Sequence, residues 1–353
     1  MNSNTSIEHG YPLLADISGF VPFVTESEIE HANEIISELL EFIVSKISSL
    51  FTIAQIDGDA IFAYAPQERI FRGEAIFELI ELTYTAYKDQ LLQVSRVRTC
   101  GCNACRNTSK LDLKFAVHYG EYIPSEFQKQ FDLIGIAPYF IRKRDWKEPV
   151  KEATKWQGYV LFTEDSLKQL GLQPEELQVV EIPGGAVRTF GMDLESRYNS
   201  MLKYRNVIIN SKDAISSFTM DFPISPTLLW DWINDPEKRS QWFILKWSAQ
   251  TRPGGRTGSG AVNHCNHGIG DTLETILDWR PFEYYTSEFQ IRPFNIRIRQ
   301  TTQLEPLPEN RTHLRLNIKP ENDSSGWFTK FVCKIFASYE KYVFKRLIHL
   351  SVQ

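Results

Sequence analysis

Two acidic residues beside glycines are the strongest candidates for chemistry in this chain. Asp16 lies in Ala-Asp-Ile-Ser-Gly-Phe at 15–20, and Asp59 closes Gln-Ile-Asp-Gly-Asp at 55–59. Each stands at the edge of a short apolar run, where a strand would end and a carboxylate could face a cation. Magnesium prefers oxygen ligands, typically one or two carboxylates together with the phosphates of a substrate. The pair indicates a metal–nucleotide site, and the alternative is a pair of ordinary turns.

The elements around these residues follow a known order. After the first strand, apolar residues three and four apart predict a helix over 26–50. A hairpin over 51–65 turns at Asp-Gly-Asp, a strong tight-turn signal. A second long amphipathic helix (68–94) and a strand (111–118) follow. Strand, helix, hairpin, helix, strand is the ferredoxin-like order of an α+β layer, with the helices on one face of the sheet.

Three segments resemble the class III nucleotide cyclases, in the order of that family. They are the apolar strand with Asp-Ile-x-Gly-Phe at 14–20, the strands around Gly-Asp at 56–64, and Phe-Ala-Val-His-Tyr-Gly-Glu at 115–121. The resemblance covers about residues 10 to 190. It implies two Mg²⁺ or Mn²⁺ ions on a nucleoside triphosphate, one activating the ribose 3′-hydroxyl and one the leaving pyrophosphate. The implied metal residues are Asp16, Ile17 and Asp59, and the implied substrate contacts include Gly19 and Phe20.

The same resemblance assigns base recognition and transition-state stabilisation. Gln55 and Asp132 fall on the two positions that read the base, and Gln offers both a donor and an acceptor, so the base stays open. Tyr139 stands where the family has its Asn, while Lys143, flanked by Arg142, aligns with the family's Arg. One hydrogen-bond donor to the charge that develops in the transition state typically raises the rate 100- to 1000-fold. Without the Asn, three alternatives are open: a slow enzyme, an enzyme that uses Tyr139, or a nucleotide-binding relic.

Three cysteines cluster in the connection after the second predicted helix. Cys100, Cys102 and Cys105 form Cys-x-Cys-x-x-Cys, which could place three thiolates around one zinc ion. The fourth ligand is not evident nearby, and His118 is expected to pack or to form a hydrogen bond within its own motif. The alternative is a set of reduced thiols without a metal.

The pattern changes after Ile215. Phe-Pro-Ile-Ser-Pro-x₄-Trp at 222–230, Asp-Trp-Arg-Pro-Phe at 278–282 and a final helix with a long apolar stripe over 327–350 resemble the SRPBCC superfamily, the START-like helix-grip fold. In that family a curved antiparallel sheet wraps the last helix and leaves a cavity for a lipid or another apolar molecule. The six Trp residues of this half suit either a ligand pocket or a plain core.

Length and composition set further expectations. A chain of 353 residues exceeds one hydrophobic core, so we expect a cyclase-like domain at 1–195, a linker at 196–213 and an SRPBCC-like domain at 214–353. The net charge of -5 gives no reason to expect nucleic-acid binding. Since neither a signal pattern nor a run of 18 apolar residues is evident, we expect a cytoplasmic protein.

Two functions follow from these patterns. The first is an enzyme that converts a nucleoside triphosphate to a 3′,5′-cyclic nucleotide and pyrophosphate, with regulation by an apolar ligand of the second domain. By the resemblance, its site needs residues from two subunits, which implies a homodimer. The second is an inactive cyclase-like scaffold or nucleotide sensor with a domain that binds a lipid or hydrophobic ligand. Asp16 and Asp59 favour the first function, and Tyr139 favours the second.

Overall fold

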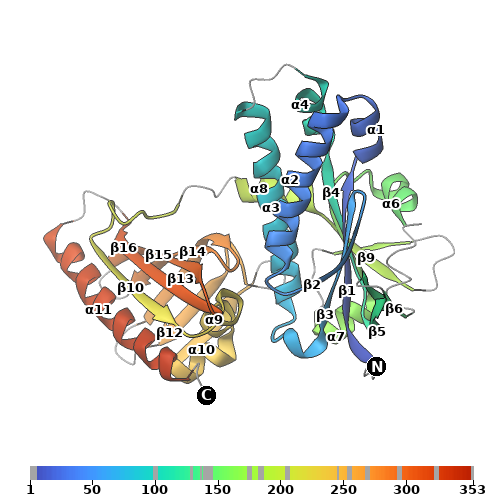
Figure 1. Cartoon of the computed structure of the whole chain (residues 1–353). Helices are drawn as coiled ribbons and strands as arrows, with labels where there is room; N and C mark the ends of the chain where they lie inside the picture. Colours follow the sequence, from blue (N-terminus) through green and yellow to red (C-terminus); the bar gives the residue numbers. More distant parts are fainter. Residues whose placement is uncertain are drawn as a thin grey trace. The chain divides into compact units, whose positions relative to one another are not determined.

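The structure, a computed structural model, divides into two compact units at 1–199 and 200–353 (Figure 1). Each unit is described by itself. The residues described are 6–97, 102–127, 130–135, 137, 146–172, 177–181, 187–202, 207–244, 246–252, 257–266, 271–291, 296–321 and 326–350. Among them, no helix is long and apolar enough to cross a bilayer.

The first unit is built on a four-stranded antiparallel core. Its strands lie in the order β2-β3-β1-β4, and α2 and α3 pack together over one face (Figure 1). This is the arrangement expected from the ferredoxin-like element order of the sequence. The elements are β1 (Glu8–Ser18), α1 (Phe20–Thr25), α2 (Ile29–Ile47), β2 (Thr52–Asp57), β3 (Ala60–Pro66), α3 (Glu74–Val97) and β4 (Asp112–Val117).

Further elements extend this core. β7 pairs in parallel with β4, β9 pairs with β7, and β8 pairs with β9. β5 pairs with the start of β1 and with β6. These elements are α4 (Asn103–Asn107), β5 (Gly120–Phe127), β6 (Gln130–Ile134), α6 (Lys147–Thr154), β7 (Tyr159–Thr163), α7 (Glu164–Leu170), β8 (Gln178–Val180), β9 (Thr189–Asp193) and α8 (Leu194–Leu202), with 3-10 turns at Gln67–Arg69 and Thr108–Lys110.

The apolar spacing of α2 explains its position on the sheet. Ile35, Ile36, Leu39, Ile43 and Ile47 recur three or four residues apart and are all buried. The helix predicted over 26–50 is shorter in the structure, where it begins at Ile29 and ends at Ile47.

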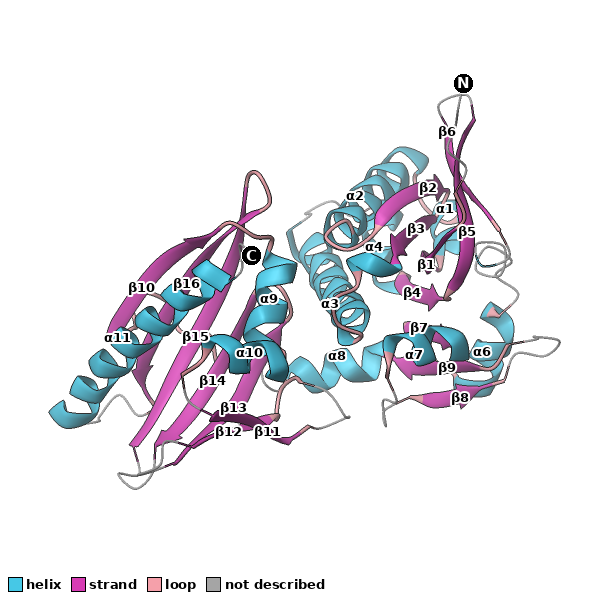
Figure 2. Cartoon of the chain, turned by 90° about the horizontal axis from the view of Figure 1, so that it is seen from below, coloured by secondary structure: helices cyan, strands magenta, loops and turns pink. Residues whose placement is uncertain are grey.

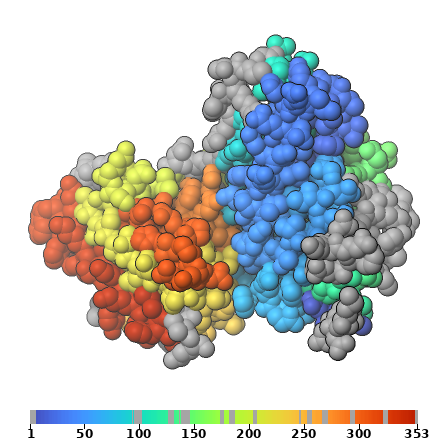
Figure 3. Space-filling view, viewed as in Figure 1, coloured from blue at the N-terminus to red at the C-terminus, as the bar shows by residue number. Residues whose placement is uncertain are grey.

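The second unit is a seven-stranded antiparallel sheet with one long helix along a face (Figure 2). The strand order is β10-β16-β15-β14-β13-β12-β11, and α11 lies at the surface of the unit (red in Figure 3). The elements are β10 (Ser216–Phe222), α9 (Pro226–Asn234), α10 (Pro236–Trp242), β11 (Lys246–Thr251), β12 (Val262–Asn266), β13 (Asp271–Arg280), β14 (Tyr284–Ile291), β15 (Ile296–Leu307), β16 (Arg311–Pro320) and α11 (Trp327–Leu350).

Local sequence signals fix the two short helices of this unit. Ser225 caps α9 by accepting a hydrogen bond from the Leu228 amide at 3.3 Å, and Asp235 caps α10 through the Lys238 amide at 2.9 Å. A proline follows each cap at the first helical position, where its missing N–H costs nothing. The predicted strand, two short helices, antiparallel sheet and final helix are all present.

Aromatic rings fill the space between this sheet and α11. The ring centres of Trp242 and Phe344 are 5.2 Å apart, and those of Phe222 and Phe344 are 6.3 Å apart. Of the six Trp residues in this half, four are buried, and Trp327 is exposed. The predicted linker at 196–213 begins inside α8, and its Ile209 is buried and accepts a hydrogen bond from Asn317 Nδ2.

Candidate functional site

The sheet brings Asp16 of β1 close to the β2–β3 turn that holds Asp59. In the register of β1 and β3, Asp16 lies opposite Ala60, and the Ile17 amide donates a 2.9 Å hydrogen bond to the Asp59 carbonyl. Gly58 has a φ of 59°, a conformation that favours glycine, and lets the hairpin turn at this point. The backbone of Asp59 thus lies beside the backbone of Ile17 at one end of the sheet, although the two residues are more than forty positions apart.

Asp16 is not an open carboxylate. It is fully buried, and the Lys147 ammonium at the start of α6 lies 2.7 Å from Oδ1 and 2.7 Å from Oδ2. Trp146, the residue before this lysine, anchors the start of α6. Its indole is buried in the core and packs edge to face on Tyr159, with the ring centres 6.1 Å apart. A buried pair of this kind is strongly coupled, since removing either partner leaves the other charge without compensation.

A second lysine adjoins the pair. Lys114 lies opposite Asp16 in the register of β1 and β4, with its ammonium 5.3 Å from the centre of the Tyr159 ring. Burial lowers the pKa of Lys114, and the Lys147 ammonium lowers it further, while Asp16 opposes both effects. The charges that act on Lys114 are Lys147, Lys151, Asp16 and Glu148, so with Lys114 itself the cluster holds three ammonium groups and two carboxylates.

This arrangement does not fit the two-ion site that the resemblance implies. Both Asp16 oxygens face the Lys147 ammonium, so a divalent ion would have to displace it. Within the described ranges, no three His, Cys, Asp or Glu side chains are grouped so as to hold a metal ion. The Lys147 ammonium therefore pairs with the carboxylate to which the resemblance assigns a metal ion.

The turn between β1 and α1 adjoins this cluster. Gly19 has a φ of 82°, and a Cβ there would come within 2.8 Å of the Lys110 carbonyl oxygen, so only glycine fits. Phe20 begins α1 and is half-buried. The two residues expected to contact a substrate thus lie three and four positions after Asp16.

The two base-recognition candidates lie on neighbouring strands. Ala54 of β2 and Leu133 of β6 pack in one small apolar cluster with Tyr122. Gln55 follows Ala54 at a β-bulge between Ile53 and Gln55, and Asp132 directly precedes Leu133. Gln55 is exposed, and Asp132 is half-buried with its carboxylate accepting from the Leu133 amide at 2.7 Å.

The transition-state candidates Tyr139, Arg142 and Lys143 lie outside the described residues. Lys147, four positions further on, was not predicted from the sequence. No spacing rule identifies it, because its partner Asp16 is 131 residues away. The buried Trp146 beside it is the only local signal that this segment packs against the sheet.

The cysteine cluster has a partner that sequence reasoning missed. His31 of α2 lies with Nδ1 3.3 Å from Cys102 Sγ, which also accepts from the Cys105 amide at 3.4 Å. The hydrogen bond to Cys102 raises the pKa of His31. Cys100 lies outside the described residues. His118 is buried, and its Nδ1 lies 2.8 Å from Thr163 Oγ1 at the end of β7, so its hydrogen-bond partner lies outside the motif at 115–121.

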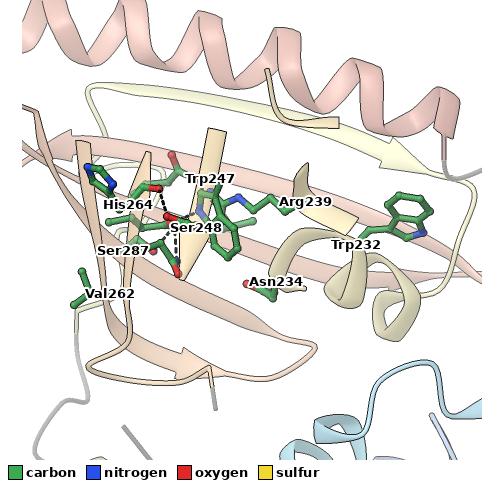
Figure 4. A network of polar contacts seen from close by, with 12 residues as sticks. Trp232, Asn234, Arg239, Trp247, Ser248, Val262, His264 and Ser287 are labelled. Carbon is green, nitrogen blue, oxygen red and sulfur yellow. Dashed lines mark hydrogen bonds and ion pairs between the residues drawn. The ribbon is translucent and has the colours of Figure 1, made fainter. Parts of the chain in front are cut away.

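A buried polar network lies inside the second unit (Figure 4). Four donors from α10, β11, β12 and β14 converge on the Glu274 carboxylate: Arg239 Nη1 at 3.1 Å, Trp247 Nε1 at 3.3 Å, Asn263 Nδ2 at 3.0 Å and Ser287 Oγ at 3.0 Å. Each oxygen of this buried carboxylate therefore has a partner. These contacts to Glu274 hold α10 against the sheet.

Glu340 faces the same network from α11. Its carboxyl is buried, and burial raises its pKa to about 7, with Glu274 adding to the rise and Arg239 opposing it. In the described part of the chain, no hydrogen-bond partner reaches its Oε1. Glu340 is therefore a titratable group inside the core of this unit.

Comparison with known proteins gives partial likenesses. Residues 36–141, less than half of the chain, match a family of proteins of unknown function (DUF2652), and no curated protein matches the sequence. Similar solved structures include a bacterial light-regulated adenylyl cyclase, at 12% identity and a TM-score of 0.43, with 57% of this chain and 59% of that chain covered. The chain therefore spans about three fifths of that relative.

Two further structures match part of the chain. The adenylyl cyclase CyaB from P. aeruginosa is 12% identical, with a TM-score of 0.37, over 53% of this chain and 95% of that chain. CalU16 from Micromonospora echinospora is 13% identical, with a TM-score of 0.29, over 37% of this chain and 71% of that chain. Similarity at these identities and TM-scores gives no information about the activity of this chain.

Proposed function

We propose that the first unit is a cyclase-like domain that binds a nucleoside triphosphate without cyclising it. The buried ion pair between Asp16 and Lys147 carries this proposal, because both carboxylate oxygens face an ammonium group instead of an open metal position. Lysine is a common phosphate ligand that acts as a point charge. In this proposal Lys147 supplies, as part of the chain, the charge that a cyclase takes from a metal ion.

The surrounding charges support an anionic ligand. Burial lowers the pKa of Lys114, the Lys147 ammonium lowers it further, and an anion beside the two lysines would oppose both effects. Base contacts would come from Gln55 and Asp132. Because Gln offers both a donor and an acceptor, these residues do not select one base.

For the second unit we propose an SRPBCC-type fold, supported by its strand order and its single long helix against the sheet. Rings of Trp242, Phe344 and Phe222 pack between the sheet and that helix. This packing favours a solid core over a large preformed ligand cavity. Ligand contacts of this unit are therefore expected on its outer surface.

The competing function is a metal-dependent cyclase, which would require Lys147 to leave Asp16. Incubation of the full chain with ATP, GTP, CTP and UTP, each with Mg²⁺ or Mn²⁺, followed by mass detection of cyclic products, separates the two. We expect no cyclic product from any triphosphate. Product formation by the unaltered chain that Asp59→Asn abolishes would establish the cyclase and overturn the proposal.

A further inference from the structure

The final helix, α11, has a second apolar face that the core does not use. Its buried residues, which include Cys333, Ala337, Val343 and Leu347, face the sheet. Large apolar side chains also lie on the solvent side, each between 46% and 79% exposed: Trp327, Phe328, Phe331, Ile335 and Tyr342.

These exposed side chains form one stripe. Trp327, Phe331 and Ile335 are spaced by four residues, and Tyr342 follows Ile335 by seven, which is two turns of a helix. The stripe lies opposite the buried positions of α11, the helix coloured red at the surface of the unit in Figure 3. Soluble proteins rarely leave a contiguous apolar surface without a partner.

The charges of α11 indicate the partner. Five basic residues, Lys330, Lys334, Lys341, Lys345 and Arg346, are all exposed, although the whole chain has a net charge of -5. The helix has one acidic residue, Glu340, and it is buried. Among the described residues, no carboxylate lies within ion-pair distance of these five basic groups.

We propose that the outer face of α11, defined as its five exposed apolar residues and its five basic residues, binds an anionic lipid surface. Aromatic side chains with flanking lysines are the pattern of helices that lie in the headgroup region, where the rings enter the acyl boundary and the lysines meet anionic headgroups. A protein partner fits less well, because protein interfaces are depleted in lysine. A second copy of α11 would bring two sets of positive charges together.

Vesicle sedimentation with the full chain tests this proposal. We expect the chain to sediment with phosphatidylcholine vesicles that contain phosphatidylglycerol, and to do so about tenfold less with phosphatidylcholine alone or at high salt. The triple change Trp327→Ser, Phe331→Ser and Ile335→Ser should abolish binding. Lys330→Glu with Lys334→Glu should remove the preference for the anionic lipid.

Matched controls separate this effect from misfolding. Val21→Ser with Ile29→Ser replaces equally exposed apolar residues of the first unit and should leave sedimentation unchanged. Every variant alters exposed side chains, so thermal unfolding should match the unaltered chain. Failure to bind anionic vesicles, or equal binding by the triple variant, would overturn the proposal. So would a lipid-independent dimer that the triple variant dissociates, which would assign this face to a second copy.

Discussion

Replacing Lys147 with methionine is expected to destabilise the first unit by about 3 kcal/mol. Removing one partner of a buried ion pair typically costs about 3 to 5 kcal/mol, because the other charge stays buried without compensation. Asp16 is fully buried, and the Lys147 side chain is 26% exposed. We expect the lower end of that range because Lys114 remains beside Asp16.

Hydrogen exchange of the β1 and β4 amides, read by mass spectrometry, measures this loss separately from the second unit. The double variant Asp16→Asn with Lys147→Met removes both charges and should recover most of the stability. Lys151→Met, on the exposed side of the same helix, should change stability by no more than about 0.5 kcal/mol. If Lys147→Met is as mild as Lys151→Met, the ion pair does not hold α6 in place.

Raising the pH from 4.5 to 8 is expected to remove about 3 kcal/mol of stability from the second unit through Glu340 alone. Its pKa is raised from 4.5 to about 7 in the folded state. Between these values the folded state binds more protons than the unfolded state, so the unfolding free energy falls as the pH rises through this window. A difference of about 2.5 pKa units corresponds to about 3 kcal/mol.

Glu340→Gln tests this contribution, because the amide cannot ionise. The difference in unfolding free energy between the variant and the unaltered chain should shift in favour of the variant as the pH rises from 4.5 to 7, and should then level off. Glu237→Gln changes an exposed carboxylate of α10 and should give no such trend. A pH-independent difference for Glu340→Gln would show that Glu340 titrates normally in the folded chain.

Sequence patterns predicted the parts of the first unit that depend on local order. The hairpin around Asp57-Gly58-Asp59 and its approach to β1 follow from turn chemistry and from the ferredoxin-like element order. The Lys147 partner of Asp16 did not follow, because the pairing joins segments more than a hundred residues apart. The contact between His31 and Cys102 was also missed, because 71 residues separate the two.

The two faces of α11 show another limit of periodicity. A spacing of three and four residues marks an apolar stripe, but α11 carries apolar residues around most of its circumference. The sequence stripe mixed the buried Val343 and Leu347 with the exposed Phe331 and Ile335. Only the position of the sheet separates the face that forms the core from the face that remains available for binding.

Titration of the full chain with ATP in the presence of EDTA tests the central claim most directly. We expect binding without a divalent ion, about 10- to 100-fold weaker binding for Lys147→Met, and no weakening for Asp16→Asn, which removes the carboxylate that competes for the ammonium. The magnitude follows from the loss of one charged contact to phosphate. Binding that requires Mg²⁺, that Asp16→Asn abolishes and that Lys147→Met retains would contradict the account and restore the metal-dependent site.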